Sequence, residues 1–205
     1  MIPIHRFLEP PMHRRQLSFR AVALVAAGLV GSVFAAAPAW AQKVKLATSM
    51  GEIVIELDAA KAPKTVDNFV KYVGAGHYDG TVFHRVIDGF MVQGGGMSPD
   101  MKEKTTRTPI VLESGNGLAN RRGSVSMART GVPDSATAQF FINLVDNTRL
   151  DATAPGKNGY AVFGKVVSGM DVVDKIRGVA VADNGPHQNV PVKPVAITKA
   201  SLLAP

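Results

Sequence analysis

The chain has 205 residues, no cysteine and a formal net charge of +7 at pH 7. The absence of cysteine excludes disulfides, zinc–thiolate sites and lipid attachment through a thiol. After position 41, Arg121-Arg122 is the only pair of adjacent basic residues. A nucleic-acid site needs a basic stripe with interleaved aromatic residues, so this scattered charge argues against nucleic acid as a partner.

The first 41 residues have the organisation of a secretory leader. A basic segment over residues 14–20 precedes an almost unbroken apolar run over residues 21–37, and Ala39-Trp40-Ala41 has small residues at both recognition positions of a signal-peptidase site. This order of regions predicts a signal peptide, residues 1–41, that is cleaved after Ala41. A retained membrane anchor is the alternative, but the apolar run is short for a full span.

Cleavage would leave residues 42–205 as one domain that is large enough for a hydrophobic core. The leader contains four arginines and one glutamate, so the remaining chain has a net charge of +4. No later apolar run is long enough to span a membrane. We therefore expect a periplasmic or secreted protein that has no membrane attachment once the leader is removed.

The domain is predicted to begin with a hairpin and a helix. Residues 43–48 and 52–57 alternate between apolar and polar positions on either side of a turn at Met50-Gly51, which predicts two antiparallel strands. Pro63 then fits the first turn of a helix whose apolar residues recur every three or four positions. Gly74 and Gly76 are expected to end this helix.

The next segment is the most informative part of the chain. Residues 83–87 and 90–93 are predicted as short strands joined by the turn dipeptide Asp88-Gly89, with the three glycines 94–96 closing the second strand at a bulge or corner. This hairpin would fold Arg85 back towards Phe90, Met91 and Gln93. His84 is expected on the opposite face of its strand, in a structural role.

The remaining residues predict further short strands and one more helix. Strands are expected at residues 110–112, 125–129, 139–144, 160–167 and 192–203, a helix at residues 170–176, and loops between them, including residues 184–191. Many short strands with two helices and no βαβ rhythm indicate a mainly β protein whose antiparallel sheet closes into a barrel. A β-sandwich is the competing architecture.

The candidate chemistry is that of a peptide-binding groove. His77, His84 and His187 lack the spacing of a metal site, no serine stands in a nucleophile elbow, and the triple glycine lacks the Lys-Ser/Thr of a phosphate loop. No metal and no cofactor are therefore expected. An arginine within a strand of a small barrel needs a partner or a groove, and nearby aromatic and amide side chains suit an apolar peptide with one carbonyl to orient.

Four motifs, in order along the chain, carry a family resemblance. They are Phe83-His84-Arg85-Val86-Ile87-Asp88-Gly89-Phe90-Met91-Val92-Gln93-Gly94-Gly95, Gly123-Ser124-Val125-Ser126-Met127-Ala128-Arg129, Ala138-Gln139-Phe140-Phe141-Ile142-Asn143 and Tyr160-Ala161-Val162-Phe163-Gly164. Residues 44–203 thereby resemble the cyclophilins, which are peptidyl-prolyl cis–trans isomerases. Together with the leader, the sequence is most similar to the periplasmic bacterial members.

The resemblance implies an eight-stranded antiparallel barrel capped by two helices and an isomerase that needs no cofactor. It implies that Arg85 is catalytic and that the proline-containing substrates are unfolded or partly folded polypeptides. It also implies substrate-binding residues, which are Phe90, Met91, Phe141 and Leu150 in a proline pocket, Gln93, Ala128 and Arg129 along the peptide, Gln139 beside Arg85, and Tyr160. The chain is expected to be monomeric and to assist the folding of exported proteins.

Two positions depart from many eukaryotic members of that family. Arg149, before Leu150, stands where those members have tryptophan, and Tyr160 stands where they have histidine. Because cyclosporin binding depends on that tryptophan, the resemblance implies weak cyclosporin binding. Two other functions remain open from the sequence alone: a proline-peptide binding module or holdase, and, more remotely, a hydrolase.

Overall fold

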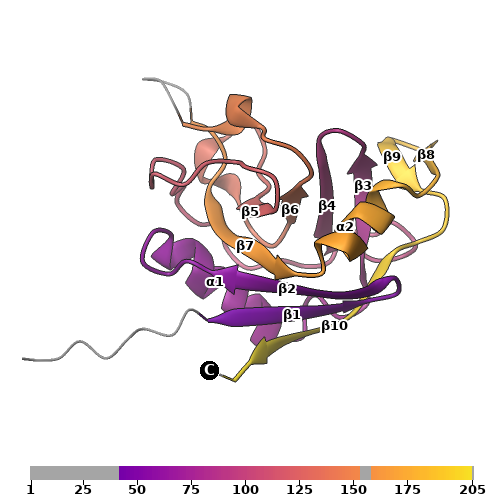
Figure 1. Ribbon diagram of the computed structural model, residues 1–205, viewed down its shortest axis with the longest axis horizontal. Helices are drawn as coiled ribbons and strands as arrows, with labels where there is room; N and C mark the ends of the chain where they lie inside the picture. Colours follow the sequence, from indigo (N-terminus) through magenta and orange to yellow (C-terminus); the bar gives the residue numbers. More distant parts are fainter. Residues whose placement is uncertain (1–41, 153–157, 205) are drawn as a thin grey trace, which may run out of the picture. The chain divides into compact units, whose positions relative to one another are not determined.

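Ten strands and two α-helices make up the described part of the chain, residues 42–152 and 158–204 of a computed structural model. The predicted leader lies outside these ranges. Eight strands close into one barrel, and their bounds are β1 (Lys43–Thr48), β2 (Gly51–Leu57), β3 (Thr81–Ile87), β4 (Met91–Met97), β5 (Ser124–Met127), β6 (Phe140–Asn143), β7 (Val162–Ser168) and β10 (Ala196–Leu203). Figure 1 shows these strands with helices α1 (Pro63–Gly74) and α2 (Met170–Arg177).

The strand order around the barrel is β1-β10-β3-β4-β6-β5-β7-β2, and every neighbouring pair is antiparallel. The first and last strands of the domain lie side by side, with Lys43 opposite Leu203. In β1, Val44 and Leu46 are fully buried, whereas Lys43 is exposed and Lys45 is half-buried. This alternation is the two-residue period of a strand with one face towards a core. The structure therefore confirms the barrel and excludes the sandwich.

Helix α1 packs its apolar face into the barrel interior. Phe69 is fully buried, and its ring centroid lies 5.1 Å from Tyr78, 5.5 Å from Phe140 and 5.0 Å from Phe163. Truncation of so large a buried ring costs about 3–5 kcal/mol. The side chain of Glu113, far along the chain, accepts hydrogen bonds from both the backbone N (2.8 Å) and Oγ1 (2.7 Å) of Thr65, and so caps the start of the helix.

Helix α2 begins after Gly169, whose φ of +87° is accessible to glycine at little cost. A Cβ at this position would lie 2.2 Å from the carbonyl oxygen of Glu52. The helix buries Val172, Val173 and Ile176. Both predicted helices are thus present, and the second ends one residue later than predicted, at Arg177. In residues 42–152 and 158–204, no helix combines the length and apolarity that a bilayer crossing requires.

Several predicted strands differ from the structure by up to four residues at an end, and the closing strand begins at Ala196 instead of residue 192. Three further predictions are wrong. Residues 110–112 form no strand, and only Ile110 makes a single bridge, to Ala136. Strand β4 continues through the three glycines to Met97 instead of ending at Gln93. Residues 184–191, expected as a loop, belong mostly to a two-stranded sheet of β8 (Val181–Asn184) and β9 (His187–Pro191), which turns at Gly185. All four β8 residues are exposed, so no apolar period marks this strand in the sequence.

Candidate active site

The β3–β4 hairpin places Arg85 directly opposite Gln93. The ladder shifts its register twice, between Val82 and Phe83 and between Phe83 and Arg85. Such bulges interrupt the alternation of side chains between the two faces of a strand. As a result, His84 and Arg85 both line one cavity of about 460 Å³. The expectation that His84 faces away from Arg85 is therefore wrong.

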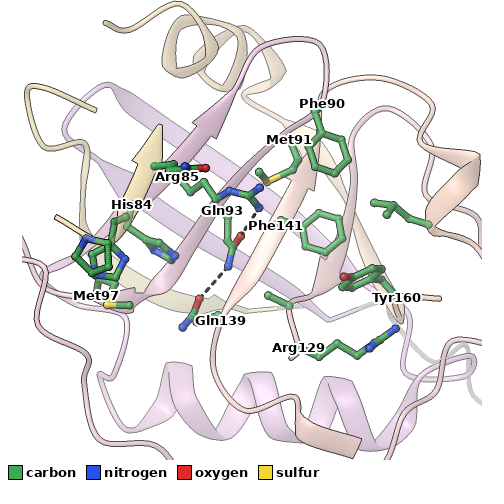
Figure 2. A pocket seen from close by; sticks show the side chains of 15 residues that line it. His84, Arg85, Phe90, Met91, Gln93, Met97, Arg129, Gln139, Phe141 and Tyr160 are labelled. Atoms are coloured by element: carbon green, nitrogen blue, oxygen red, sulfur yellow. Dashed lines mark hydrogen bonds between the residues drawn. The ribbon is translucent and has the colours of Figure 1, made fainter. Parts of the chain in front are cut away.

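The cavity brings together all ten residues that the sequence singled out. Its lining includes Arg85, Phe90, Met91, Gln93, Ala128, Arg129, Gln139, Phe141, Leu150 and Tyr160. His84, Met97 and the Pro186-His187-Gln188 segment around the β8–β9 turn complete it. Most of these side chains are seen together in Figure 2.

A chain of two hydrogen bonds holds the arginine. Nη1 of Arg85 donates to Oε1 of Gln93 at 3.4 Å, and Nε2 of Gln93 donates to Oε1 of Gln139 at 2.9 Å (Figure 2). Gln139 thus contacts Arg85 through Gln93 rather than directly. Within the described ranges, no carboxylate lies within ion-pair distance of Arg85. Its guanidinium is oriented but retains donors for a ligand.

The apolar wall comes from two neighbouring strands and a later loop. Met91 on β4 and Phe141 on β6 are only 2% and 4% exposed, although both line the cavity. The ring of Tyr160 stands edge-on to Phe141, with centroids 5.5 Å apart. Phe90 is the half-buried residue at the hairpin turn. Together these side chains form a concave apolar surface between Arg85 and Arg129 (Figure 2).

Arg129 stabilises the far wall of the cavity. Its Nε and Nη2 donate to the carbonyl of Gly159 at 2.9 and 2.8 Å, its Nη1 donates to the carbonyl of Thr130 at 2.8 Å, and its guanidinium carbon lies 4.6 Å from the Tyr160 ring centroid. The backbone N–H of Ala128 already donates to the carbonyl of Gln139. The Ala128 group that remains free to bind a ligand is therefore its backbone carbonyl, not its backbone N–H.

A buried polar network behind the wall was missed in the sequence. Nδ2 of Asn147 donates to the carbonyl of Phe90 (2.8 Å) and to Oδ1 of Asn143 (2.7 Å), and Nδ2 of Asn143 reaches Oδ1 of Asn120 at 3.2 Å. Asn120 in turn donates to the carbonyl of Leu150 at 3.2 Å. The network therefore fixes the backbone of two pocket residues. The asparagine- and glycine-rich stretch 114–123 was the available signal.

Burial keeps the imidazole of His84 neutral. Desolvation is the main cause that lowers its pKa to about 4, and the positive charges of His187 and Arg85 act in the same direction. Hydrogen bonding to Val82 and Gln139 opposes this shift without reversing it. An imidazole with this pKa is almost never in its acidic imidazolium form near pH 7, which argues against His84 as a general acid.

Residues 42–152 and 158–204 contain no group of three or more histidine, aspartate or glutamate side chains placed to hold a metal ion. The cavity instead combines a concave apolar wall, the oriented guanidinium groups of Arg85 and Arg129, and the amides of three glutamines. These features define a binding site for an apolar ring attached to a polar backbone.

Comparison with known proteins identifies this class. Residues 43–202 match the family described as cyclophilin type peptidyl-prolyl cis-trans isomerase/CLD. The chain is 57% identical over 162 residues to peptidyl-prolyl cis-trans isomerase cyp18 of Streptomyces antibioticus, with 78% of this chain and 98% of the relative covered. It is 54% identical to peptidyl-prolyl cis-trans isomerase A of Dickeya dadantii, with 88% and 96% covered.

Solved structures agree with this result. A cyclophilin type peptidyl-prolyl cis-trans isomerase of Cryptosporidium parvum, crystallised in the presence of the dipeptide Ala-Pro, superposes with a TM-score of 0.66 at 26% identity, covering 80% of this chain and 100% of that chain. The chain belongs to the cyclophilin family. It is accordingly a peptidyl-prolyl cis–trans isomerase, or rotamase, built on the closed β-barrel described above.

Proposed function

We propose that Arg85 accelerates rotation about X–Pro bonds by stabilising the twisted amide. The barrier to this rotation is about 18–20 kcal/mol, because rotation breaks the amide resonance. The uncatalysed exchange takes roughly tens to hundreds of seconds, which is slow enough to limit folding. No covalent bond is made or broken, so the reaction requires no nucleophile.

The twisted amide differs from both planar isomers at its nitrogen. Loss of conjugation returns the lone pair to that atom, which then accepts a hydrogen bond more strongly. A donor at this position binds the transition state better than either ground state, and only such differential binding accelerates the step. The observation that carries the proposal is the guanidinium of Arg85, held by Gln93 beside the apolar wall without a carboxylate partner in the described ranges.

The remaining cavity residues would hold the substrate while its acyl side turns. Phe90, Met91, Phe141 and Leu150 would enclose the pyrrolidine ring, and the polar groups of Gln93 and Tyr160, with the backbone at Ala128 and Arg129, would bind the peptide. The Ala-Pro dipeptide named with the Cryptosporidium relative supports proline-containing peptides as substrates. Unfolded or partly folded polypeptides present such peptides in extended form.

The test is the activity of Arg85→Ala and Arg85→Lys in a protease-coupled isomerisation assay. We expect both variants to lose most of kcat/KM, by roughly 10- to 100-fold for a hydrogen bond to a charged donor. Lysine keeps the charge but lacks the planar fork of donors. Arg107→Lys is the matched control, since Arg107 is exposed and lies outside the cavity. Parental activity in Arg85→Ala would contradict the mechanism.

We also propose that the natural substrates are exported proteins whose folding the enzyme assists as a chaperone in the periplasm. The support is the leader-like sequence of residues 1–41, which ends two residues before the family match at residue 43. The mass of the protein recovered from the periplasm tests this, with cleavage after Ala41 expected. Recovery of the full-length chain from the membrane would contradict export. We also propose that the mature protein is a monomer, which light scattering would test.

A refolding assay separates catalysis from simple binding. If the enzyme assists folding by isomerisation, Arg85→Ala will fail to accelerate the refolding of a protein limited by proline. If binding alone protects clients from aggregation, Arg85→Ala will protect them as well as the parent does. We expect the first result, because the described cavity is the size of a few residues rather than of an extended client surface.

A further inference from the structure

Two arginines, Arg85 and Arg129, line the cavity, and a third, Arg149, stacks on the lining residue Phe90; their guanidinium groups differ in what they bind. All three nitrogens of the Arg129 group donate to backbone carbonyls, and Arg85 donates to Gln93. Arg149 is exposed, and its guanidinium carbon lies 4.7 Å from the ring centroid of Phe90. Within residues 42–152 and 158–204, the Arg149 group takes part in no ion pair and no side-chain hydrogen bond.

The stacking on Phe90 orients Arg149 without using its hydrogen-bond donors. A guanidinium that lies over an aromatic ring covers one flat face and leaves the N–H groups at its edge. Phe90 also lines the cavity, so these donors are held at the rim of the proline site. A freely rotating surface arginine would lose side-chain entropy on binding, and the stacked arginine has lost part of it beforehand.

The acidic residues nearby are already engaged. Asp146 pairs with Arg121 at 2.9 Å, Asp88 pairs with Arg177 at 3.4 Å, and Asp151 accepts two hydrogen bonds from Asn120. None of the described residues that line the cavity is acidic, whereas Arg85 and Arg129 both carry a positive charge. The adjoining residues 153–157 contain no aspartate or glutamate either. The rim therefore presents a positive potential to an entering peptide.

We propose that Arg149 gives the isomerase a preference for substrates with an aspartate or glutamate within two residues of the reacting proline. The substrate carboxylate would accept hydrogen bonds from the exposed edge of the guanidinium, in the planar geometry that arginine and carboxylate share. This inference rests on the proposed function, because it assumes that the proline ring enters the cavity beside Phe90. It makes Arg149 a determinant of specificity and leaves the rotation itself to Arg85.

The expected effect is modest, since the pair would form at an exposed site. Measured couplings of exposed ion pairs correspond to about a two- to fivefold change in affinity. The preference should appear mainly in KM, because the carboxylate is bound equally in the planar and twisted states. It should also decrease as salt is raised, because the Debye length falls from about 10 Å at 0.1 M to about 3 Å at 1 M salt.

The experiment compares peptides that differ only in charge beside proline. There are two pairs of peptides, and within each pair glutamate is exchanged for its neutral analogue glutamine. The exchanged residue stands two positions before proline in one pair and directly after proline in the other. Exchange NMR measures isomerisation without a coupling protease that has its own preference for charge. The proteins are the parent, Arg149→Gln, Arg149→Lys and the matched control Arg107→Gln, which removes an exposed arginine outside the cavity.

In the parent and in Arg107→Gln, we expect the glutamate peptide of at least one pair to have a kcat/KM two- to fivefold above its glutamine analogue. This ratio should fall to about one in Arg149→Gln. Arg149→Lys should keep less than half of the preference, because it retains the charge and loses the stacked fork.

The two proposals fail in different ways. An unchanged ratio in Arg149→Gln, or a parental ratio of one in both pairs, would overturn the acidic preference. Full preference in Arg149→Lys would overturn the role of the stacked guanidinium. Failure of the parent to accelerate exchange in the neutral glutamine peptides would instead contradict the proposed function, because those peptides do not depend on Arg149.

Discussion

His84 and Arg85 are consecutive in the chain, and both side chains line the same cavity because the β3–β4 ladder shifts its register between Phe83 and Arg85. A 94% buried imidazole is thereby held next to a permanent cation. Both burial and this charge favour the neutral form of the imidazole. The bulge that orients the proposed catalytic group thus also makes the folded state sensitive to acid.

Stability should therefore fall between pH 6.5 and pH 4. The pKa of His84 decreases from 6.5 to about 4 on folding, so the unfolded chain binds an additional proton in this range. The stabilisation from neutral His84 is complete above pH 6.5 and is lost progressively as the pH falls towards 4. We expect a loss of about 2–3 kcal/mol between pH 7.5 and 4.5, measured by urea unfolding.

His84→Gln removes this titration and should reduce the slope over that range, leaving the contribution of His77, whose pKa is also lowered by burial. His187→Gln is the comparison, since it removes only the charge effect of His187 on the pKa of His84 and should leave the desolvation effect, and with it most of the slope, in place. Desolvation raises the pKa of Asp79, but the hydrogen bonds from Lys199 and the backbone of Ala200 outweigh it, so the pKa is lowered overall. This carboxylate should therefore contribute at the acid end in every variant. A parental slope in His84→Gln would show that another group binds the proton.

The hydrogen-bonded chain from Gln139 through Gln93 to Arg85, the amide relay, predicts an order of effects. Gln93→Ala removes the hydrogen bond to Arg85 directly, so we expect about a tenfold loss of kcat/KM in the protease-coupled assay. Gln139→Ala removes only the support of Gln93 and should cost about threefold. In the double variant the losses should be less than additive, because both act through Arg85. Larger loss in Gln139→Ala than in Gln93→Ala would contradict the relay.

The parts of the site that were predictable depend on local pattern and on family motifs. The turn at Asp88-Gly89, which folds Arg85 back towards Met91 and Gln93, follows from the hairpin pattern. The pairing of Arg85 with Gln93 did not follow from it, because the second strand begins at Met91 rather than at Phe90. The direction of His84 was not predictable, because alternation fails where the ladder shifts. That shift depends on how the glycines of β4 pack against Phe83 and Phe140, which are distant contacts that no strand pattern contains.

Two further features needed the tertiary structure. The asparagine network joins residues 4 to 57 positions apart, and its members are buried only because the loops around Asn120 and Asn147 fold over one another. All residues of β8 are exposed, so the β8–β9 sheet has no apolar pattern on that strand and is defined by its backbone pairing. Conversely, the apolar triplet 110–112 looked like a strand but finds only one bridge, and Val111 remains 44% exposed.

Gly96 should be required for the amide relay. A Cβ at this position would lie 2.4 Å from Cγ and 2.7 Å from Cδ of Gln139. Gly96→Ala must therefore displace Gln139, and we expect the activity loss of Gln139→Ala together with about 1–3 kcal/mol of destabilisation from overpacking. Gly131→Ala is the control, because no atom lies within 4 Å of its Cβ position. Full activity in Gly96→Ala would show that Gln139 is dispensable.

Cyclosporin binding should respond to Arg149 in a direction opposite to that of the acidic peptides. The family resemblance implies that an indole at this position favours the drug, and Arg149 is exposed enough for the larger ring to replace its guanidinium over Phe90. Arg149→Trp should bind cyclosporin about tenfold more tightly than the parent, because the indole adds apolar contact area and one N–H donor. Inhibition of the isomerase measures this affinity. Arg149→Ala removes the charge without adding a ring, so it should show little gain. Equal affinities of the two variants would mean that loss of charge, rather than the indole, determines drug binding.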